Sequence, residues 1–377
     1  MSAPVVGARR GGRALAGAAV DAGTPIGRGA RRRGGFGLAL ALLAAALVVT
    51  VVVAVGSGPV AIPMGKVWRI VAARAWPGLD DGSWTAAQSQ IVWQVRLPRV
   101  LLAAVVGAGL AVVGTTLQAL VRNPLADPYV LGITSGAAVG AVGVILLGWS
   151  AFGVYSLSAS AFLGALGAFA LVFAMAQRHG RLSPMRMVLA GVAVSYLLSA
   201  VTSFLIFWAD TDGIKARSVL FWLLGGLGGA RWSHLGLPAA AVAAGTAALA
   251  LQARRLNALV MGDETATSLG VRVDRFRRQL FVLASLLTAV LVAVSGGIGF
   301  VGLMMPHACR LLVGPDHRRV LPVALLGGAL FLVWADLAAR TVAAPEELPL
   351  GIVSALAGAP FFLYLLRRRL PEAGASV

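Results

Sequence analysis

Long apolar runs separated by short polar loops fill most of the chain. Because the hydrocarbon core of a bilayer is about 30 Å thick, each crossing helix needs roughly 20 apolar residues. Runs near this length predict ten membrane-spanning helices, at residues 37–55, 98–120, 130–149, 154–176, 187–208, 233–251, 280–298, 301–313, 320–340 and 350–366. The pattern therefore predicts an all-α membrane protein with one transmembrane domain over residues 36–377.

The eighth run, 301–313, is too short to cross a bilayer alone at normal tilt. Gly299, Gly302 and Pro306 flank or interrupt it, so we interpret it as a half-length or broken helix. Backbone of this kind is tolerated at membrane depth only where other protein shields it. We therefore expect neighbouring helices to cover this segment.

The basic residues test the number of crossings, since the cytoplasmic loops of membrane proteins carry an excess of Lys and Arg. With the N-terminus inside and the spans alternating, 22 basic residues fall on the cytoplasmic side and nine on the outer side. Leaving out the eighth segment would move the basic residues 367–369 to the outer side. The distribution therefore favours ten spans with both termini in the cytoplasm.

The N-terminal segment 1–35 is rich in Arg, Gly and Ala and is predicted to be a disordered, basic cytoplasmic tail. The apolar run that follows it is longer than the h-region of a usual signal peptide, and no small-residue cleavage site ends it. We therefore expect the first span to stay uncleaved.

The composition limits the chemistry that the chain can perform. Hydrophobic residues make up 59% of the 377 residues and charged residues 12%, with a net charge of +18. A single cysteine excludes an intramolecular disulfide and a multi-cysteine metal site. Nucleic-acid binding would favour arginines clustered on a soluble module, whereas these are scattered over loops. We predict no catalytic residue, no metal site and no nucleic-acid partner.

Nothing in the spans predicts a built-in energy source. Asp336 is the single carboxylate in the ten runs, and its spacing from Arg340 predicts an ion pair on one helix face. An ion-coupled carrier usually needs buried ionisable groups and is the weaker alternative. Gly65-Lys66 is not followed by Ser or Thr, so the phosphate-binding loop of an ATPase is missing. A membrane enzyme is a third alternative. An enzyme that uses clustered acidic metal ligands is not favoured, because the one pair of adjacent aspartates, Asp80 and Asp81, lies outside the spans.

Glycine supplies 47 residues, many at four-residue spacing, as at Gly132, Gly136 and Gly140. Small residues at this spacing let helix backbones approach closely in lipid. The dense run 295–300 is different because it interrupts a helix next to the short eighth segment. It predicts a chain reversal or a gate, with simple helix packing as the alternative.

Two segments on the predicted cytoplasmic side are candidates for a function. The run Asn123-Pro124-Leu125-Ala126-Asp127-Pro128 has two prolines that cannot continue a helix, so it predicts a rigid turn. That turn is either a connector or a gate at the mouth of the bundle.

The second segment, 256–278, is the longest cytoplasmic loop between spans. Asp263 and Glu264 suit the first turn of a short helix, and Gly270 suits its end. Ala266, Leu269 and Leu259 would give this helix an apolar side. The loop therefore predicts a docking element for a soluble partner, or otherwise a solvated loop.

Several motifs resemble one known family. They are Arg96-Leu97-Pro98-Arg99, the run 123–128, Leu189-Ala190-Gly191-Val192, Phe221-Trp222-Leu223-Leu224-Gly225-Gly226, the run 299–303 and Glu347-Leu348-Pro349-Leu350-Gly351. In order and spacing they closely resemble the binding-protein-dependent permeases for iron-siderophores, haem and vitamin B12. The resemblance covers about residues 40–370 and leaves out the N-terminal tail.

This resemblance implies ten transmembrane helices in two inverted five-helix halves, in the bacterial plasma (inner) membrane. It implies a second permease subunit, identical or homologous, two ATPase subunits that hold ATP and Mg²⁺, and an extracytoplasmic substrate-binding protein. No cofactor is expected on this chain, which contacts membrane lipid. Iron-siderophore import is the first expectation, with cobalamin or haem import as alternatives.

The resemblance also implies site residues. Docking of the binding protein is expected at Arg96, Arg99 and Arg340. Coupling to the ATPase is expected at Gly262, Asp263, Glu264, Ala266, Leu269 and Gly270. The cytoplasmic gate is expected at Asn123, Leu125, Ser183 and Pro184.

Overall fold

The computed structural model describes residues 26–369, except 77, 79–81, 179–180 and 210–213. Its α-helices are α1 (Ile26–Gly56), α2 (Met64–Ala75), α3 (Ala86–Gln90), α4 (Leu97–Val121), α5 (Ile133–Leu147), α6 (Ser156–Ala176), α7 (Pro184–Ala209), α8 (Ile214–Leu223), α9 (Gly236–Leu251), α10 (Ala253–Val260), α11 (Asp263–Ser268), α12 (Val273–Ser295), α13 (Val301–Val313), α14 (His317–Thr341) and α15 (Leu350–Arg369). Four short helices are η2 (Ile91–Arg96), η3 (Pro128–Leu131), η4 (Gly153–Tyr155) and η5 (Trp232–His234). Two-residue strands β1 (Gln177–Arg178) and β2 (Arg181–Leu182) pair antiparallel between α6 and α7.

Each of the ten predicted spans corresponds to one helix of this fold. Among the described residues, seven helical stretches are long and apolar enough to cross a membrane. Three shorter apolar helices, α5, α13 and α15, complete the ten. The all-α class is confirmed, and the eighth span is confirmed as the half-length helix α13 of 13 residues.

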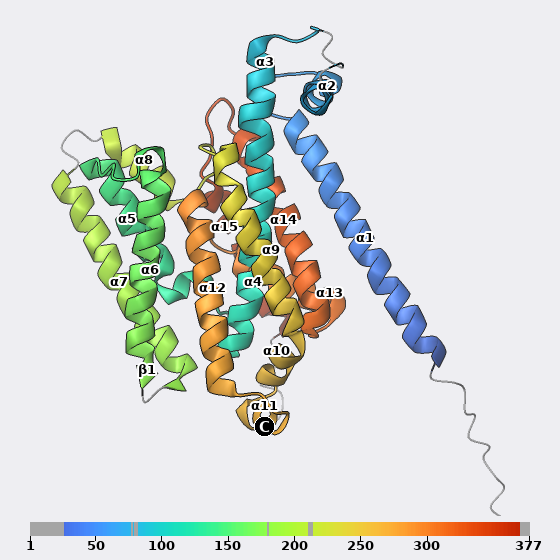
Figure 1. Cartoon of the computed structure of the whole chain (residues 1–377), viewed down its shortest axis with the longest axis vertical. Coiled ribbons are helices and arrows are strands. Elements are labelled where there is room, and N and C mark those ends of the chain that lie inside the picture. The colour runs from blue at the N-terminus through green and yellow to red at the C-terminus, as the bar shows by residue number, and fades with distance from the viewer. Residues whose placement is uncertain (1–25, 77, 79–81, 179–180, 210–213, 370–377) are drawn as a thin grey trace, which may run out of the picture.

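Helix α4 runs through the centre of the bundle (Figure 1). It packs against α9, α12, α13 and α14, and nearly all of its residues are buried. Glycines allow these approaches: a Cβ at Gly107 would overlap the carbonyl oxygen of Gly328, and one at Gly114 would overlap that of Gly302. Gly136 of α5 meets Gly164 of α6 in the same way. The predicted role of spaced glycines in close packing is therefore confirmed.

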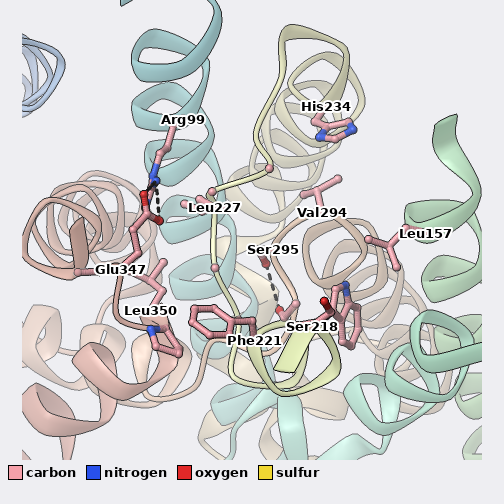
Figure 2. Close-up of a pocket in the computed structure, with 18 of the residues that line it drawn as sticks. Arg99, Leu157, Ser218, Phe221, Leu227, His234, Val294, Ser295, Glu347 and Leu350 are labelled. Atoms are coloured by element: carbon pink, nitrogen blue, oxygen red, sulfur yellow. Dashed lines mark hydrogen bonds and ion pairs between the residues drawn. The ribbon is translucent and has the colours of Figure 1, made fainter. Parts of the chain in front are cut away.

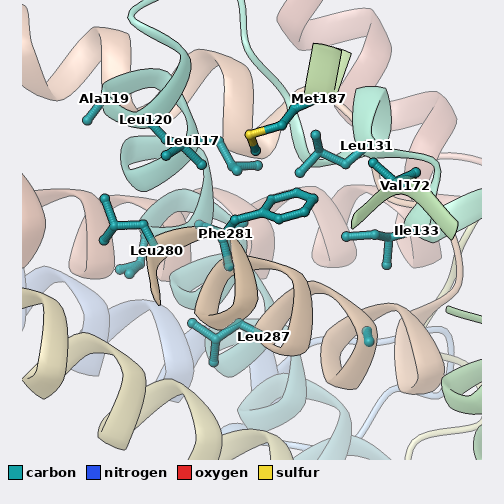
Figure 3. Close-up of a cluster of buried hydrophobic side chains, with 14 of the residues drawn as sticks. Leu117, Ala119, Leu120, Leu131, Ile133, Val172, Met187, Leu280, Phe281 and Leu287 are labelled. Atoms are coloured by element: carbon teal, nitrogen blue, oxygen red, sulfur yellow. The ribbon is translucent and has the colours of Figure 1, made fainter. Parts of the chain in front are cut away.

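The largest buried side chain of the core is Phe281 of α12 (Figure 3). Its ring lies 5.3 Å from that of Phe169 on α6, and Leu117, Ile133 and Met187 belong to the same buried cluster. This cluster joins α4, α5, α6, α7 and α12.

The predicted boundaries change at two places. Helix α1 begins at Ile26, inside the segment 1–35 predicted to be a tail, while residues 1–25 lie outside the described residues. The second span is preceded by helix from Ala86 onward, so that helical structure continues for 36 residues to Val121. Helix η2 in this stretch is π-helical, a form that often marks functional sites.

The connection before the second span also contains α2, which the search for long apolar runs missed. Helix α2 buries Val67 and Ile70 and exposes Arg69, and it is seen end-on in Figure 1, across the direction of the long helices. Helices α2, α3 and α8 lie at one end of the molecule, which we call the α2 end, and α10, α11 and β1 lie at the opposite end, the α11 end (Figure 1).

Candidate functional site

The turn at residues 122–128 is fixed by its own polar groups. Arg122 ends α4 in the left-handed conformation, with φ of 54°. The side-chain oxygens of Asn123 and Asp127 each accept a hydrogen bond from the backbone N–H two residues on, that of Leu125 and Tyr129, both at 2.9 Å. The predicted rigid turn is confirmed. It leaves Asn123 and Leu125 exposed at the α11 end.

The carboxyl of Asp127 is an unusual group in this turn. Burial raises the pKa of this carboxyl from 3.8 to about 6, while the hydrogen bond from the Tyr129 N–H acts in the opposite direction. At neutral pH the buried carboxyl is therefore mostly ionised, and burial of this charge costs the folded protein some stability.

The predicted docking loop contains two helices, α10 and α11, instead of one. Gly262 precedes α11 with φ of 120° and Gly270 follows it with φ of 79°, conformations that favour glycine at both positions. Asp263 and Glu264 occupy the first turn of α11, as predicted. This geometry explains why glycine stands at both ends of so short a helix.

The residues of α11 divide into buried and accessible ones. Leu269 is 65% exposed and Glu264 is exposed, so both are available to a partner. Ala266 is fully buried against the core. The apolar side of α11 thus covers this chain's own core, and the role of Ala266 in coupling to the ATPase stays a prediction.

Asp263 joins three segments at the α11 end. Both of its carboxylate oxygens accept hydrogen bonds from Arg277 of α12, at 2.6 and 2.9 Å. Its Oδ1 atom also lies 3.5 Å from Nη2 of Arg122, the residue that ends α4. The ion pairs therefore connect α11 both to a spanning helix and to the rigid turn.

A groove of about 900 Å³ lies next to this network. It is lined by Ser183 and Pro184, two of the predicted gate residues, together with Arg122, Asp263 and Arg277. The residues predicted for the gate and for coupling are thus neighbours in space.

Sequence reasoning missed further residues at this end. Met261, 70% exposed, adds an accessible apolar side chain beside α11. Asn257 of α10 donates to Asp316 at 2.7 Å and accepts from the backbone N–H of His317 at 2.9 Å, which ties α10 to the start of α14. Only the amphipathic character of 253–261 could have indicated these positions.

At the α2 end, Arg99 lies between the carboxylates of Asp336 and Glu347, and Figure 2 shows its pairing with Glu347. Its Nε atom donates to Asp336 at 2.8 Å, and its Nη1 atom donates to both carboxylate oxygens of Glu347, at 2.8 and 3.0 Å. Arg340 lies 3.4 Å from the other oxygen of Asp336, which confirms the predicted pair on one helix face. Helices α4 and α14 and the connection before α15 are held together here.

Arg96 and Arg340 also bind the end of α1 and the segment that follows it. Arg96 donates to the carbonyl oxygens of Val55, Gly56 and Val60, and Arg340 to those of Ala54 and Ser57. The last carbonyl groups of a helix have no partner within it, so the guanidinium groups satisfy them.

These contacts correct the expected exposure of the three arginines. Arg96, Arg99 and Arg340 are only 4%, 6% and 3% exposed. The structure brings the three together at one end, as grouped in the sequence analysis, but with their charged groups directed into the protein. Their predicted role in docking is not tested by this arrangement and stays a prediction.

Two of the family-like motifs, 221–226 and 347–351, meet the glycine-rich run 295–300 at the α2 end in one junction of helix ends. Gly226 N–H donates to the Ser295 carbonyl, Leu350 N–H to Gly225 and Gly351 N–H to Leu224, each at 2.9 Å. Between α12 and α13, Gly296 and Phe300 have φ of 64° and 68°, so the chain reverses there, as predicted. A gating role for this run stays a prediction.

A cavity of about 540 Å³ adjoins this junction (Figure 2). Its walls are mostly apolar, and Arg99, Glu347 and His234 contribute its ionisable groups. Among the described residues no group of three His, Cys, Asp or Glu side chains could hold a metal ion, and Asp80 and Asp81 lie outside them.

The chain matches known proteins along most of its length. Residues 46–368 match the profile of the family described as the FecCD transport family. The cobalamin import system permease protein BtuC of Halobacterium salinarum is 50% identical over 279 residues, which is 74% of each chain. The hemin transport system permease protein HmuU of Yersinia pestis is 43% identical, over 76% of this chain and 87% of its own.

The fold matches a solved structure as well. An inward-facing metal-chelate type ABC transporter superposes with a TM-score of 0.75 at 35% identity, covering 88% of this chain and 99% of its own.

Proposed function

This chain belongs to the FecCD transport family, and we propose that it forms the membrane pathway through which an intact metal chelate enters the cell. It is a multi-pass permease subunit of an ABC importer and not an enzyme, since ATP hydrolysis in such importers belongs to a separate subunit. The observation that carries the proposal is the match over residues 46–368, together with the projecting α10–α11 unit at one end.

The α11 end is proposed as the cytoplasmic surface that receives the ATPase partners, which bind ATP and Mg²⁺. Leu125, Met261 and Leu269 would supply apolar contacts there, and Glu264 a charged one. The position of this surface agrees with the charge count, which puts the same loops and both termini in the cytoplasm.

The gate is proposed beside this surface. The rigid turn with Asn123 and Leu125 would close the pathway by bringing an apolar side chain into its cytoplasmic mouth, where water is readily excluded. Ser183 and Pro184 would form its second part across the groove. A second permease subunit, identical in the simplest assembly, would complete the pathway.

The extracytoplasmic binding protein is proposed to dock at the α2 end, where the sequence motif places Arg96, Arg99 and Arg340. Because these side chains are buried, docking would use the rim of their network rather than freely exposed cations.

The substrate class is proposed as a large chelate. Two of the relatives are named for cobalamin and hemin, which favours these two chelates at least as much as the iron-siderophores expected from the sequence.

Reconstitution tests this proposal. The permease with its ATPase partners, in liposomes, is supplied with candidate binding proteins loaded with cobalamin, haem or an iron-siderophore. The expected result is ATP-dependent uptake and stimulated ATP hydrolysis with one chelate class. Uptake of none of the three under any pairing would contradict the proposal.

A further inference from the structure

We propose that Glu347 pairs with Arg99 only until the binding protein docks, and that a carboxylate of the binding protein then replaces Glu347 on this arginine. This inference rests on the proposed function and identifies how an acidic partner would engage a cluster of arginines that is otherwise closed.

The charge of the cluster supports a further acidic group. Arg96, Arg99 and Arg340 bring three positive charges, while Asp336 and Glu347 bring two negative ones. The cluster therefore has an excess of one positive charge. Because a buried charge is costly unless it is paired, this excess favours an incoming carboxylate.

Exposure singles out one member of the cluster. The side chain of Glu347 is 42% exposed, whereas those of Arg99 and Asp336 are 7% and 1% exposed. Asp336 is held from two sides, by Arg99 and Arg340, but the hydrogen bonds of Glu347 all go to Nη1 of Arg99. Glu347 is therefore the carboxylate that can leave while Arg99 keeps a partner.

An approach to this pair is open. Gly228 adjoins it, and a Cβ at this position would lie 3.4 Å from Oε2 of Glu347 and 3.9 Å from Nη1 of Arg99. Gly228 is exposed, and it lines the same cavity of about 540 Å³ as Arg99 and Glu347. The missing side chain leaves room for a carboxylate of the partner beside the arginine.

Exchange at Arg99 would also reach the helix junction. Glu347 lies three residues before α15, whose first two N–H groups, those of Leu350 and Gly351, donate to the carbonyl groups of Gly225 and Leu224, just after the end of α8. Release of Glu347 would therefore remove an ion-pair anchor from the connection that leads into this junction.

The test measures the affinity of the substrate-free binding protein for the complete transporter in lipid nanodiscs at low salt. Substrate-free protein is used so that anionic groups of the chelate cannot contribute. Glu347→Gln is compared with Glu346→Gln, a matched control that removes the same charge one residue away, from an exposed pair with Arg217 at 3.4 Å. We expect Glu347→Gln to bind about two- to fivefold more tightly than the control, the range of an accessible ion pair.

Equal or weaker binding by Glu347→Gln than by Glu346→Gln would overturn the inference. A second variant, Gly228→Leu, fills the approach while leaving the arginine cluster in place, and we expect it to weaken binding. Wild-type affinity in Gly228→Leu would also overturn the inference. Absence of any binding to the wild-type transporter would instead contradict the proposed function itself.

Discussion

Asp336 is the residue on which the arginine cluster depends most. It is 1% exposed, and its two oxygens face Arg99 at 2.8 Å and Arg340 at 3.4 Å. Removing one partner of a buried ion pair leaves an uncompensated charge, which typically costs about 3–5 kcal/mol. The pairing of charges inside the protein, and not their contact with solvent, therefore determines the stability of the α2 end.

Replacing Asp336 by Asn should accordingly lower the thermal midpoint of the detergent-solubilised protein by several degrees, because two buried guanidinium groups lose their shared carboxylate. Unfolding followed by the fluorescence of a thiol probe at the buried Cys309 measures the midpoint. Glu346→Gln, which changes an exposed carboxylate, serves as control and should shift it little. Equal midpoints for the two variants would contradict this role of Asp336.

Asp127 gives the stability a pH dependence of known sign. Its pKa of about 6 in the folded protein exceeds the ordinary 3.8, so the folded state binds the proton more tightly than the unfolded state does. The contribution of this group to stability therefore falls as the pH rises from about 4 to 6, and the loss is complete above that range.

Asp127→Asn should remove this dependence, because the amide oxygen can still accept from the Tyr129 N–H and carries no charge. Thermal midpoints of both proteins between pH 4 and 7 provide the comparison. The variant should be the more stable protein at pH 7, with the two converging toward pH 4. A parallel pair of curves would show that Asp127 does not titrate in this range.

At the scale of elements, the α11 segment contains both an exposed residue proposed to contact the ATPase and a buried residue that supports folding. Leu269, which directly follows α11, is 65% exposed, whereas Ala266 within the helix is fully buried. Leu269→Asp should leave folding intact and reduce the ATP hydrolysis that the binding protein stimulates, because the apolar contact with the ATPase proposed above would be lost. Ala266→Asp should instead prevent folding, since it buries an unpaired charge.

Expression level and size-exclusion profile report folding, and stimulated ATPase activity reports coupling. Glu264→Gln, at another exposed position of this loop, is the control for a change at the surface. A Leu269→Asp variant with full stimulation would show that α11 is not the ATPase contact.

The elements that the sequence predicted well are those with long apolar periodicity, including the half-length α13, whose glycines indicated the break. Helices α2 and η2 were not predicted, because short amphipathic segments contain no apolar run long enough to span a membrane. The burial of Arg96, Arg99 and Arg340 could not be predicted either. It depends on where the end of α1 arrives in space, and the charge count records only the side of the membrane.

At the scale of the whole molecule, the ten described spanning helices, with α4 at their centre, contain few carboxylates. In the described spanning helices the carboxylates are Asp336, locked between two arginines, and Asp274, in the first turn of α12. A carrier driven by protons or sodium needs an ionisable group that can gain and lose the coupling ion within the membrane. The match to ABC importer permeases over most of the chain instead indicates that a separate ATPase subunit supplies the energy for uphill transport.

Liposomes that contain this chain alone should therefore show no accumulation of cobalamin, haem or iron-siderophore under an imposed proton or sodium gradient. The same chain with its ATPase and binding-protein partners should accumulate one of them only when ATP is supplied on the side of α11. Asp336→Asn distinguishes the explanations, because a coupling carboxylate would be essential for uphill transport while a structural one affects it only through stability. Gradient-driven accumulation by the isolated chain, abolished by this substitution at a temperature where the variant is folded, would contradict the assignment of the chain as a passive permease subunit.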